Sequence, residues 1–154
     1  MCPHRVIPRR PPYRARPRAA PATPDDARFA GTDSSLSAQI ETARSLLARL
    51  TDGRTGEASL YLTSAESDGG LVTLTFEYFV NGIPISLTDG PAAAVTLSGA
   101  AITELSVHVR AYETGAAASD LLPVHQAAAL TKTGRLRVGY ADSGDSTPGV
   151  GWMD

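Results

Sequence analysis

Three residues in the second half of the chain have the side-chain types of an acid–base site. Glu104, His108 and Arg110 lie at alternate positions of a run in which apolar and polar residues alternate. In an extended strand, all three side chains would project from one side of a sheet. Such a group could supply a general base or a charged surface for a partner. We favour a solvated sheet face, because that interpretation requires no further residue.

The remaining chemical candidates are isolated. His125 has no second histidine or cysteine at ligand spacing, Asp142 and Asp145 lack the further oxygen ligands that calcium requires, and Cys2 is the single cysteine. The segments SDGGL and SGDSTPG lack the pattern of a phosphate-binding loop, so we interpret both as turns. We therefore predict no catalytic residue, no cofactor and no metal site. A hydrolase that uses His108 with Glu104 or Asp142 stays open as an alternative.

Composition bounds the fold. The 154 residues suit one domain and a tail, and 42% hydrophobic residues with 19% charged residues are enough to build a core. No apolar stretch approaches the roughly 18–20 residues that a membrane-spanning helix needs. Two enzyme-sized domains are excluded.

The net charge of −2 conceals two unlike segments. Residues 1–24 contain six arginines, seven prolines and no acid, whereas the rest of the chain carries 16 acids and 8 bases. Proline lacks a backbone donor and disfavours helix, so we expect residues 1–32 to form a disordered tail and residues 33–154 to form a single domain. An arginine arm could bind nucleic acid or an anionic membrane. We favour a solvated linker, since Tyr13 is the one aromatic residue there and the domain is acidic.

The domain begins with an amphipathic helix. Apolar residues recur at steps of three and four on one face, at Leu36, Ile40, Ala43, Leu47 and Leu50. Asp33 or Ser34 could cap the start, and Gly53 follows the end. The spacing predicts a helix over 34–51.

The period then changes to two. Alternation from Glu57 predicts two antiparallel strands joined by a hairpin at 67–70, with the apolar side facing the helix. On the second strand, Thr73, Thr75 and Glu77 face away. Pro84 predicts an edge strand over 83–86, and the run 103–111 is expected to be the longest and central strand.

A second, short helix follows a Gly/Ala loop. Asp120 could cap it, Pro123 fits its first turn and Gly134 ends it. The run RLRVGYAD predicts a last strand, and the turn-rich end places Trp152 as an anchor against the body. The fold class is thus α+β: an antiparallel sheet of about five to six strands, the first helix on one face, and the short helix before the last strand.

A series of phrases along residues 57–153 resembles the carboxyl-terminal domain of YycH/YycI-type regulators of Gram-positive bacteria. The matching phrases are Val80–Pro84, then Gly99, Ile102 and Leu105, then LLPVHQAAA with Leu121, Leu122, Pro123, Gln126, Ala127 and Ala129, and finally Leu136, Val138, Tyr140 and Asp142. The resemblance implies a PepSY-like α+β module without catalytic activity. It also implies an extracytoplasmic location, a membrane anchor and control of a cell-wall-linked two-component sensor kinase by contact.

The sequence departs from that family at its start, where the arginine/proline tail replaces the expected membrane helix. We expect either a fragment of a longer envelope protein or a chain that has lost its anchor.

Our leading hypothesis is a module that contacts a protein partner, either a membrane sensor kinase or a related regulator. The predicted contact surface is either an interaction face that comprises Thr73, Thr75, Glu77, Glu104, His108 and Arg110, or the edge near Pro84, which could accept a strand of the partner. The alternative is a PepSY- or cystatin-like module that binds a small ligand or a protease between the first helix and the sheet. A packed layer of Leu47, Leu50, Phe76 and Tyr78 would leave that pocket no room.

Overall fold

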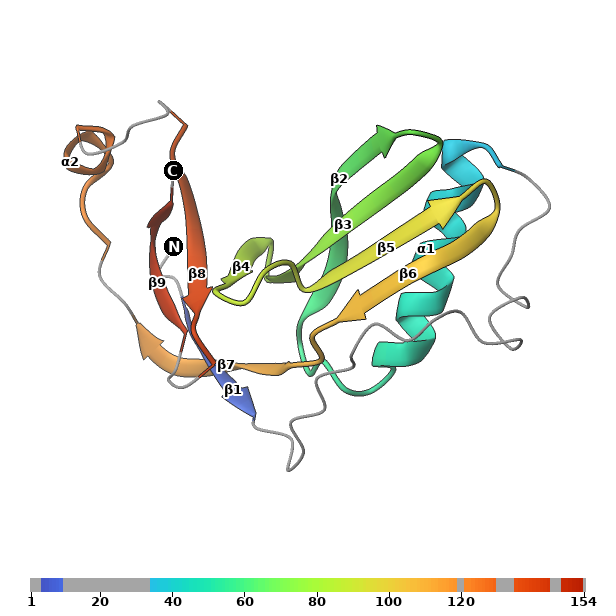
Figure 1. The fold of residues 1–154 in the computed structure, drawn as a ribbon. Helices are drawn as coiled ribbons and strands as arrows, with labels where there is room; N and C mark the ends of the chain where they lie inside the picture. Colours follow the sequence, from blue (N-terminus) through green and yellow to red (C-terminus); the bar gives the residue numbers. More distant parts are fainter. Residues whose placement is uncertain (1–3, 10–33, 119–120, 130–134, 145–147, 154) are drawn as a thin grey trace.

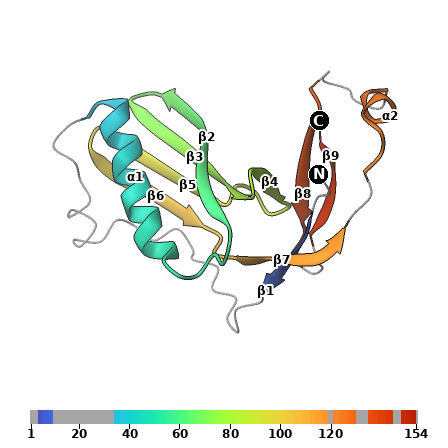
Figure 2. The same cartoon turned by 180° about the vertical axis from the view of Figure 1, so that it is seen from behind.

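The computed structural model describes residues 4–9, 34–118, 121–129, 135–144 and 148–153. Its elements, in chain order, are β1 (His4–Arg9), α1 (Leu36–Thr51), β2 (Ser59–Asp68), β3 (Leu71–Val80), β4 (Ile83–Leu87), β5 (Ala93–Ser98), β6 (Ala101–Val107), β7 (Ala111–Ala118), α2 (Val124–Ala128), β8 (Arg137–Asp142) and β9 (Gly149–Met153). The α+β class is confirmed: α1 lies across one face of a mostly antiparallel sheet (Figures 1 and 2).

Helix α1 forms where the period of three and four predicts it. The Ser35 side chain caps its start by accepting a hydrogen bond from the Ala38 N–H at 3.3 Å, one residue after the predicted caps. Ala43, Leu46 and Leu47 are buried against the sheet. Gly53 follows the helix with a φ of 63°, in the left-handed region that glycine favours.

The large sheet has seven strands. Its path is β6-β5-β3-β4-β8-β9, and β2 pairs with β3 from the other side. All of these pairs are antiparallel except β4 with β8. Strand β3 therefore has three partners: its first six residues pair with β5, its last three pair with β4, and β2 runs along its other edge.

The predicted hairpin is present between β2 and β3. Asp68 pairs with Leu71 across Gly69 and Gly70, whose φ values of 56° and 83° suit a two-residue turn. One side of β3 is buried, and Thr73, Thr75 and Glu77 lie on the other side.

Strand β4 is not the edge strand that Pro84 predicted. It pairs with β3 through residues 83–85 and with β8 through residues 85–87. Pro84 follows the closing pair of a two-residue hairpin, so its nitrogen points away from β3, and β8 begins to pair only at Ile85. The missing N–H therefore breaks no ladder bond.

The expected long central strand over 103–111 is two strands instead. β6 ends at Val107 and lies at the edge of the large sheet, while β7 pairs with β1 in a separate two-stranded sheet. A register shift against β5 between Thr96 and Leu97 also breaks the alternation, so Thr103 is exposed and Ile102 packs on the core. The longest strands are β2 and β3, with ten residues each.

Residues 4–9, which the sequence assigned to a disordered tail, instead pair with β7 as strand β1. The rest of residues 1–32 lies outside the described residues, so the tail and domain boundary remain predictions.

Helix α2 starts at Val124 with Pro123 as its N-cap; the predicted cap Asp120 and stop Gly134 also lie outside the description. The turn-rich end forms β9, whose Trp152 Nε1 donates to the Leu122 carbonyl at 2.7 Å.

The buried residues form two core clusters. The α1 cluster lies between α1 and the sheet and comprises Ala43, Leu47, Leu74, Phe76, Ala93, Val95, Leu97 and Val107. The tyrosine cluster lies where β3 and β4 meet β7 and β8, and comprises Ala58, Tyr78, Val80, Ile85, Ala92, Tyr112 and Tyr140. Gly56 brings the chain to this second cluster at a φ of 64°, and a Cβ there would lie 2.3 Å from the Tyr112 carbonyl oxygen.

Candidate functional site: an open sheet face and a buried polar cluster

The side of the large sheet opposite α1 is the first candidate, and we call it the open face (Figures 1 and 2). Strand pairing places on it Tyr61, Ser64, Glu66 and Asp68 from β2, Thr73, Thr75, Glu77 and Phe79 from β3, Thr96 from β5, and Glu104 from β6. Most of these residues are polar, because this side lies toward solvent while the other packs on α1.

Two contacts order the side chains of the open face. Tyr61, with 57% of its surface exposed, packs edge to face against Phe79 with 5.1 Å between ring centroids. The Thr73 and Thr96 hydroxyls share a hydrogen bond of 3.3 Å between β3 and β5. The open face thus combines an exposed aromatic ring, held by its neighbour, with hydrogen-bonded polar side chains.

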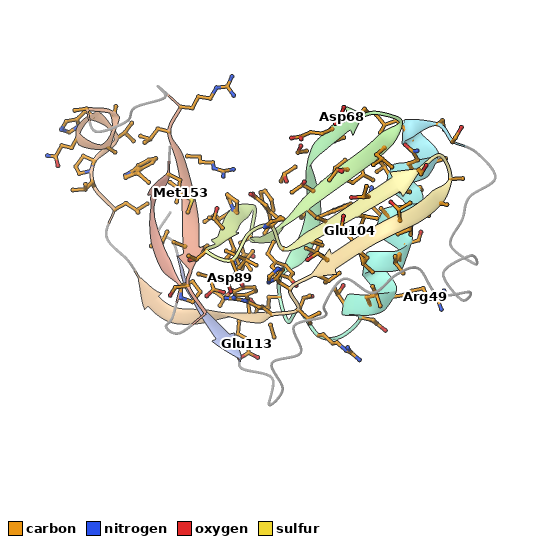
Figure 3. All side chains as sticks on the ribbon, in the orientation of Figure 1. Arg49, Asp68, Asp89, Glu104, Glu113 and Met153 are labelled. Carbon is orange, nitrogen blue, oxygen red and sulfur yellow. The ribbon has the colours of Figure 1, made fainter. Side chains whose placement is uncertain are left out.

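Among the described residues of the open face, Glu77 forms an ion pair with a neighbouring strand. Its carboxylate lies 3.9 Å from the Arg137 guanidinium of β8. Arg137 is half exposed, so this pair adds little stability. The other described acids of the open face are Glu66, Asp68 and Glu104, and the face is therefore acidic (Figure 3 labels Asp68 and Glu104).

The structure brings together four of the six predicted interaction residues: Thr73, Thr75, Glu77 and Glu104. His108 and Arg110 do not continue this face, because β6 ends at Val107. The His108 N–H donates to the Ala92 carbonyl at 2.8 Å, which carries the β5–β6 pairing one residue past Val107, and β7 begins at Ala111. The predicted trio therefore does not share one side of a strand, and the hydrolase hypothesis stays a prediction.

Asp142, at the end of β8, is the centre of the second candidate, a polar cluster in which Asp142 and Tyr112 are buried, Arg110 is partly buried and Asp89 is exposed. Its side chain is 1% exposed. One carboxylate oxygen accepts from the Tyr112 hydroxyl at 2.7 Å and lies 2.7 Å from Arg110 Nη1, and the other accepts from the Gly144 N–H at 2.7 Å. Two hydrogen bonds and one ion pair therefore compensate the buried charge.

Arg110 links this cluster to the loop after β4. Its other terminal nitrogen lies 3.4 Å from Asp89, and Gly144 lies against the guanidinium, where a Cβ would come within 3.1 Å of it. Burial alone would lower the pKa of Arg110, but the hydrogen bond and charge of Asp142 outweigh burial and raise that pKa. The guanidinium is therefore a permanent cation.

The two tyrosines beside this ion pair are hydrogen-bond donors. Burial raises the pKa of Tyr112, and the hydrogen bond and charge of Asp142 raise it further. Burial also raises the pKa of Tyr78, whose hydroxyl donates to the His108 carbonyl at 2.9 Å. Neither phenol acts as a base near neutral pH, so the polar cluster is equipped to hold β7, β8 and the β4 loop together.

The sequence contained one signal for this cluster. Leu136, Val138 and Tyr140 alternate on one side of the predicted last strand, and Asp142 is the next position on that side. A carboxylate at a position that alternation assigns to the core requires buried donors. Nothing local indicated that Arg110 and Tyr112 would supply them from 30 residues away.

The space expected for a small ligand is filled. Leu47 is 2% exposed and Phe76 is 1% exposed, and both belong to the packed α1 cluster; Tyr78 is buried in the neighbouring cluster, while Leu50 is 39% exposed at the margin. Within the described part of the chain, no group of three or more potential ligands could hold a metal ion. Asp145 lies outside the described residues.

Comparison with known proteins identifies no relative. No protein-family model matches the chain, and no significant similarity is found to curated proteins or to solved structures. Among the described helices, none has the length and apolar character required to span a membrane. The open face is thus assigned from its own geometry.

Proposed function

We propose that the protein is a non-catalytic regulatory module that acts by contact with another protein through its open face. The observation that supports this most directly is the asymmetry of the sheet. Helix α1 buries one side, whereas the other side presents Tyr61 on Phe79 among threonines and acids. An exposed aromatic residue held by a neighbour, with polar residues around it, is typical of a protein interface.

The resemblance to YycH/YycI-type regulators supports a more specific form of the proposal. In this form, the partner is a cell-wall-linked sensor kinase or a second regulator of that kinase, and contact takes place outside the cytoplasm. The uncovered sheet is compatible with this role, because a module that controls another protein by contact requires an accessible surface and no catalytic residues.

A site-specific photo-crosslinker tests the proposal in cells that express the full chain. We expect a crosslinker at Thr75, in the middle of the open face, to give one discrete product that contains a membrane sensor kinase or its regulator. The matched position is Ser45, exposed on α1, and it should give no such product. If Thr75, Thr96 and Tyr61 all fail to give a protein adduct, the open face is not the contact surface.

A further inference from the structure

Strand β2 is a free edge of the large sheet. It pairs with β3 along its whole length, and none of the described residues pairs with its outer side (Figures 1 and 2). Every second residue of an edge strand directs its N–H and C=O outward. Counting from the Asp68–Leu71 closing pair of the hairpin, Ala65 and Ser67 are outward positions. These groups could pair with a strand from another protein.

β2 is also the longest edge of the large sheet, with ten residues against seven in β6 and five in β9. Like those of β6 and β9, its sequence SLYLTSAESD contains no proline, lysine or arginine, the residues that commonly block edges. The register shift between Leu62 and Ser64 confines regular pairing on β2 to its two parts, of which Ser64–Asp68 is the longer.

The charge beside this part of β2 selects the chemistry of the partner. Glu66 and Asp68 are exposed and lie two residues apart on the open face. Glu66 accepts a hydrogen bond from Ser64 at 3.2 Å. Within the described part of the chain, neither Glu66 nor Asp68 forms an ion pair. Directly opposite residues of paired strands face each other, so an added strand with basic residues at alternate positions would match both acids.

We infer that β2 accepts an extended, basic segment of the partner protein as an additional strand. The segment carries two lysines or arginines separated by one residue, which lie opposite Glu66 and Asp68, and its end contacts the exposed ring of Tyr61. This inference rests on the proposed function and specifies its partner. Residues 25–154 carry 16 acids and 8 bases, and this negative charge disfavours β2 of a second copy as the occupant.

The test uses the full chain and a capped nine-residue peptide that alternates arginine and valine, with a glutamate/valine peptide of the same design as its control. Nuclear magnetic resonance should place the largest amide shifts of the arginine peptide at Ala65 and Ser67, and the glutamate peptide should cause none. Replacing Glu66→Lys together with Asp68→Lys should weaken binding by about tenfold.

The matched variant is Glu41→Lys with Asp52→Lys, which changes the net charge equally at two exposed acids on and just after α1, away from β2 and the open face. It should weaken binding by less than about twofold. Equal losses in the two variants would show unspecific attraction and overturn the inference, as would shifts that map to β6 or β9. Sedimentation that reveals a dimer blocking the peptide would assign β2 to a second copy instead. Adducts from Thr75 with no binding at β2 would overturn this inference and leave the proposed function standing.

Discussion

The two core clusters bury similar numbers of residues but depend on different forces. The α1 cluster contains aliphatic residues, alanines and one phenylalanine, so its stability comes from apolar area and close packing. The tyrosine cluster adjoins Asp142 and Arg110, and its phenols donate hydrogen bonds that must be oriented. Truncating an apolar side chain in the α1 cluster therefore lowers stability in proportion to the area and volume lost. Removing Asp142 or Arg110 beside the tyrosine cluster instead leaves its partner's charge without that counter-charge.

Asp142→Ala should cause the largest loss of stability. It removes the acceptor of two hydrogen bonds and the closer of the two carboxylates beside Arg110, which keeps Asp89 at 3.4 Å, so we expect the free energy of unfolding to fall by about 3 kcal/mol. Urea unfolding measures this change. The double variant Asp142→Leu with Arg110→Met removes both charges and should recover most of the loss. If the double variant is as unstable as the single one, charge is not what distinguishes the two clusters.

Leu47→Ala probes the α1 cluster. Its side chain is 2% exposed, and its removal leaves a cavity that the surrounding residues only partly fill, so unfolding should become easier by about 3 kcal/mol. Leu50→Ala, on the same helix but 39% exposed, is the control and should cost less than about 1 kcal/mol. Equal losses would mean that α1 does not pack in the register described.

High pH should act on the tyrosine cluster alone. An unfolded tyrosine ionises near pH 10, whereas burial raises the folded pKa of Tyr78 and Tyr112. Above about pH 10 the unfolded state therefore loses protons that the folded state keeps, and stability falls by up to about 1.4 kcal/mol per pH unit for each tyrosine. For the two tyrosines together, we expect a loss of up to about 3 kcal/mol at pH 11 relative to neutral pH.

Urea unfolding at pH 9, 10 and 11 measures this dependence. Tyr112→Phe should remove about half of the alkaline loss, and Tyr61→Phe, on the open face, should leave it unchanged. A slope that Tyr112→Phe does not alter would show that other groups cause the alkaline loss.

Thr73→Val should have the smallest effect. It removes one hydrogen bond to Thr96 on the open face but keeps the shape and the β-propensity of the side chain, so stability should change by less than about 0.5 kcal/mol. Thermal unfolding is sufficient to check it. A loss above 1 kcal/mol would mean that the open face is part of the core, which would contradict its assignment as a contact surface.

Local patterns predicted the parts of the molecule that depend on neighbours in the chain. Helix α1 and the β2–β3 hairpin follow from periodicity and from glycines at the turn. The errors arose where distant segments decide the outcome. Pro84 suggested an edge because a proline lacks an N–H, but the ladder at that position does not use one. The run 103–111 is split because β6 pairs with β5 whereas β7 pairs with β1, which comes from a distant part of the chain.

The candidate site divides in the same way. Alternation placed Thr73, Thr75 and Glu77 on one side of a strand, and they lie there. Asp142 was considered as a cation ligand because its neighbours are turn residues, whereas its position on the buried side of β8 required Arg110 and Tyr112, which precede it by about 30 residues. Such pairings are set by tertiary structure, and one sequence contains no direct signal for them.

The three-way pairing of β3 has a consequence for motion. Opening the β2 edge, the β5–β6 side or the β4–β8–β9 side separately still leaves β3 bonded to the remaining partners. Backbone amides of β3 should thus exchange with deuterated solvent only when the whole sheet comes apart, while those of β9 and β6 exchange through smaller openings. The middle of β3 is then the place where the slowest-exchanging protons report the global unfolding of the protein.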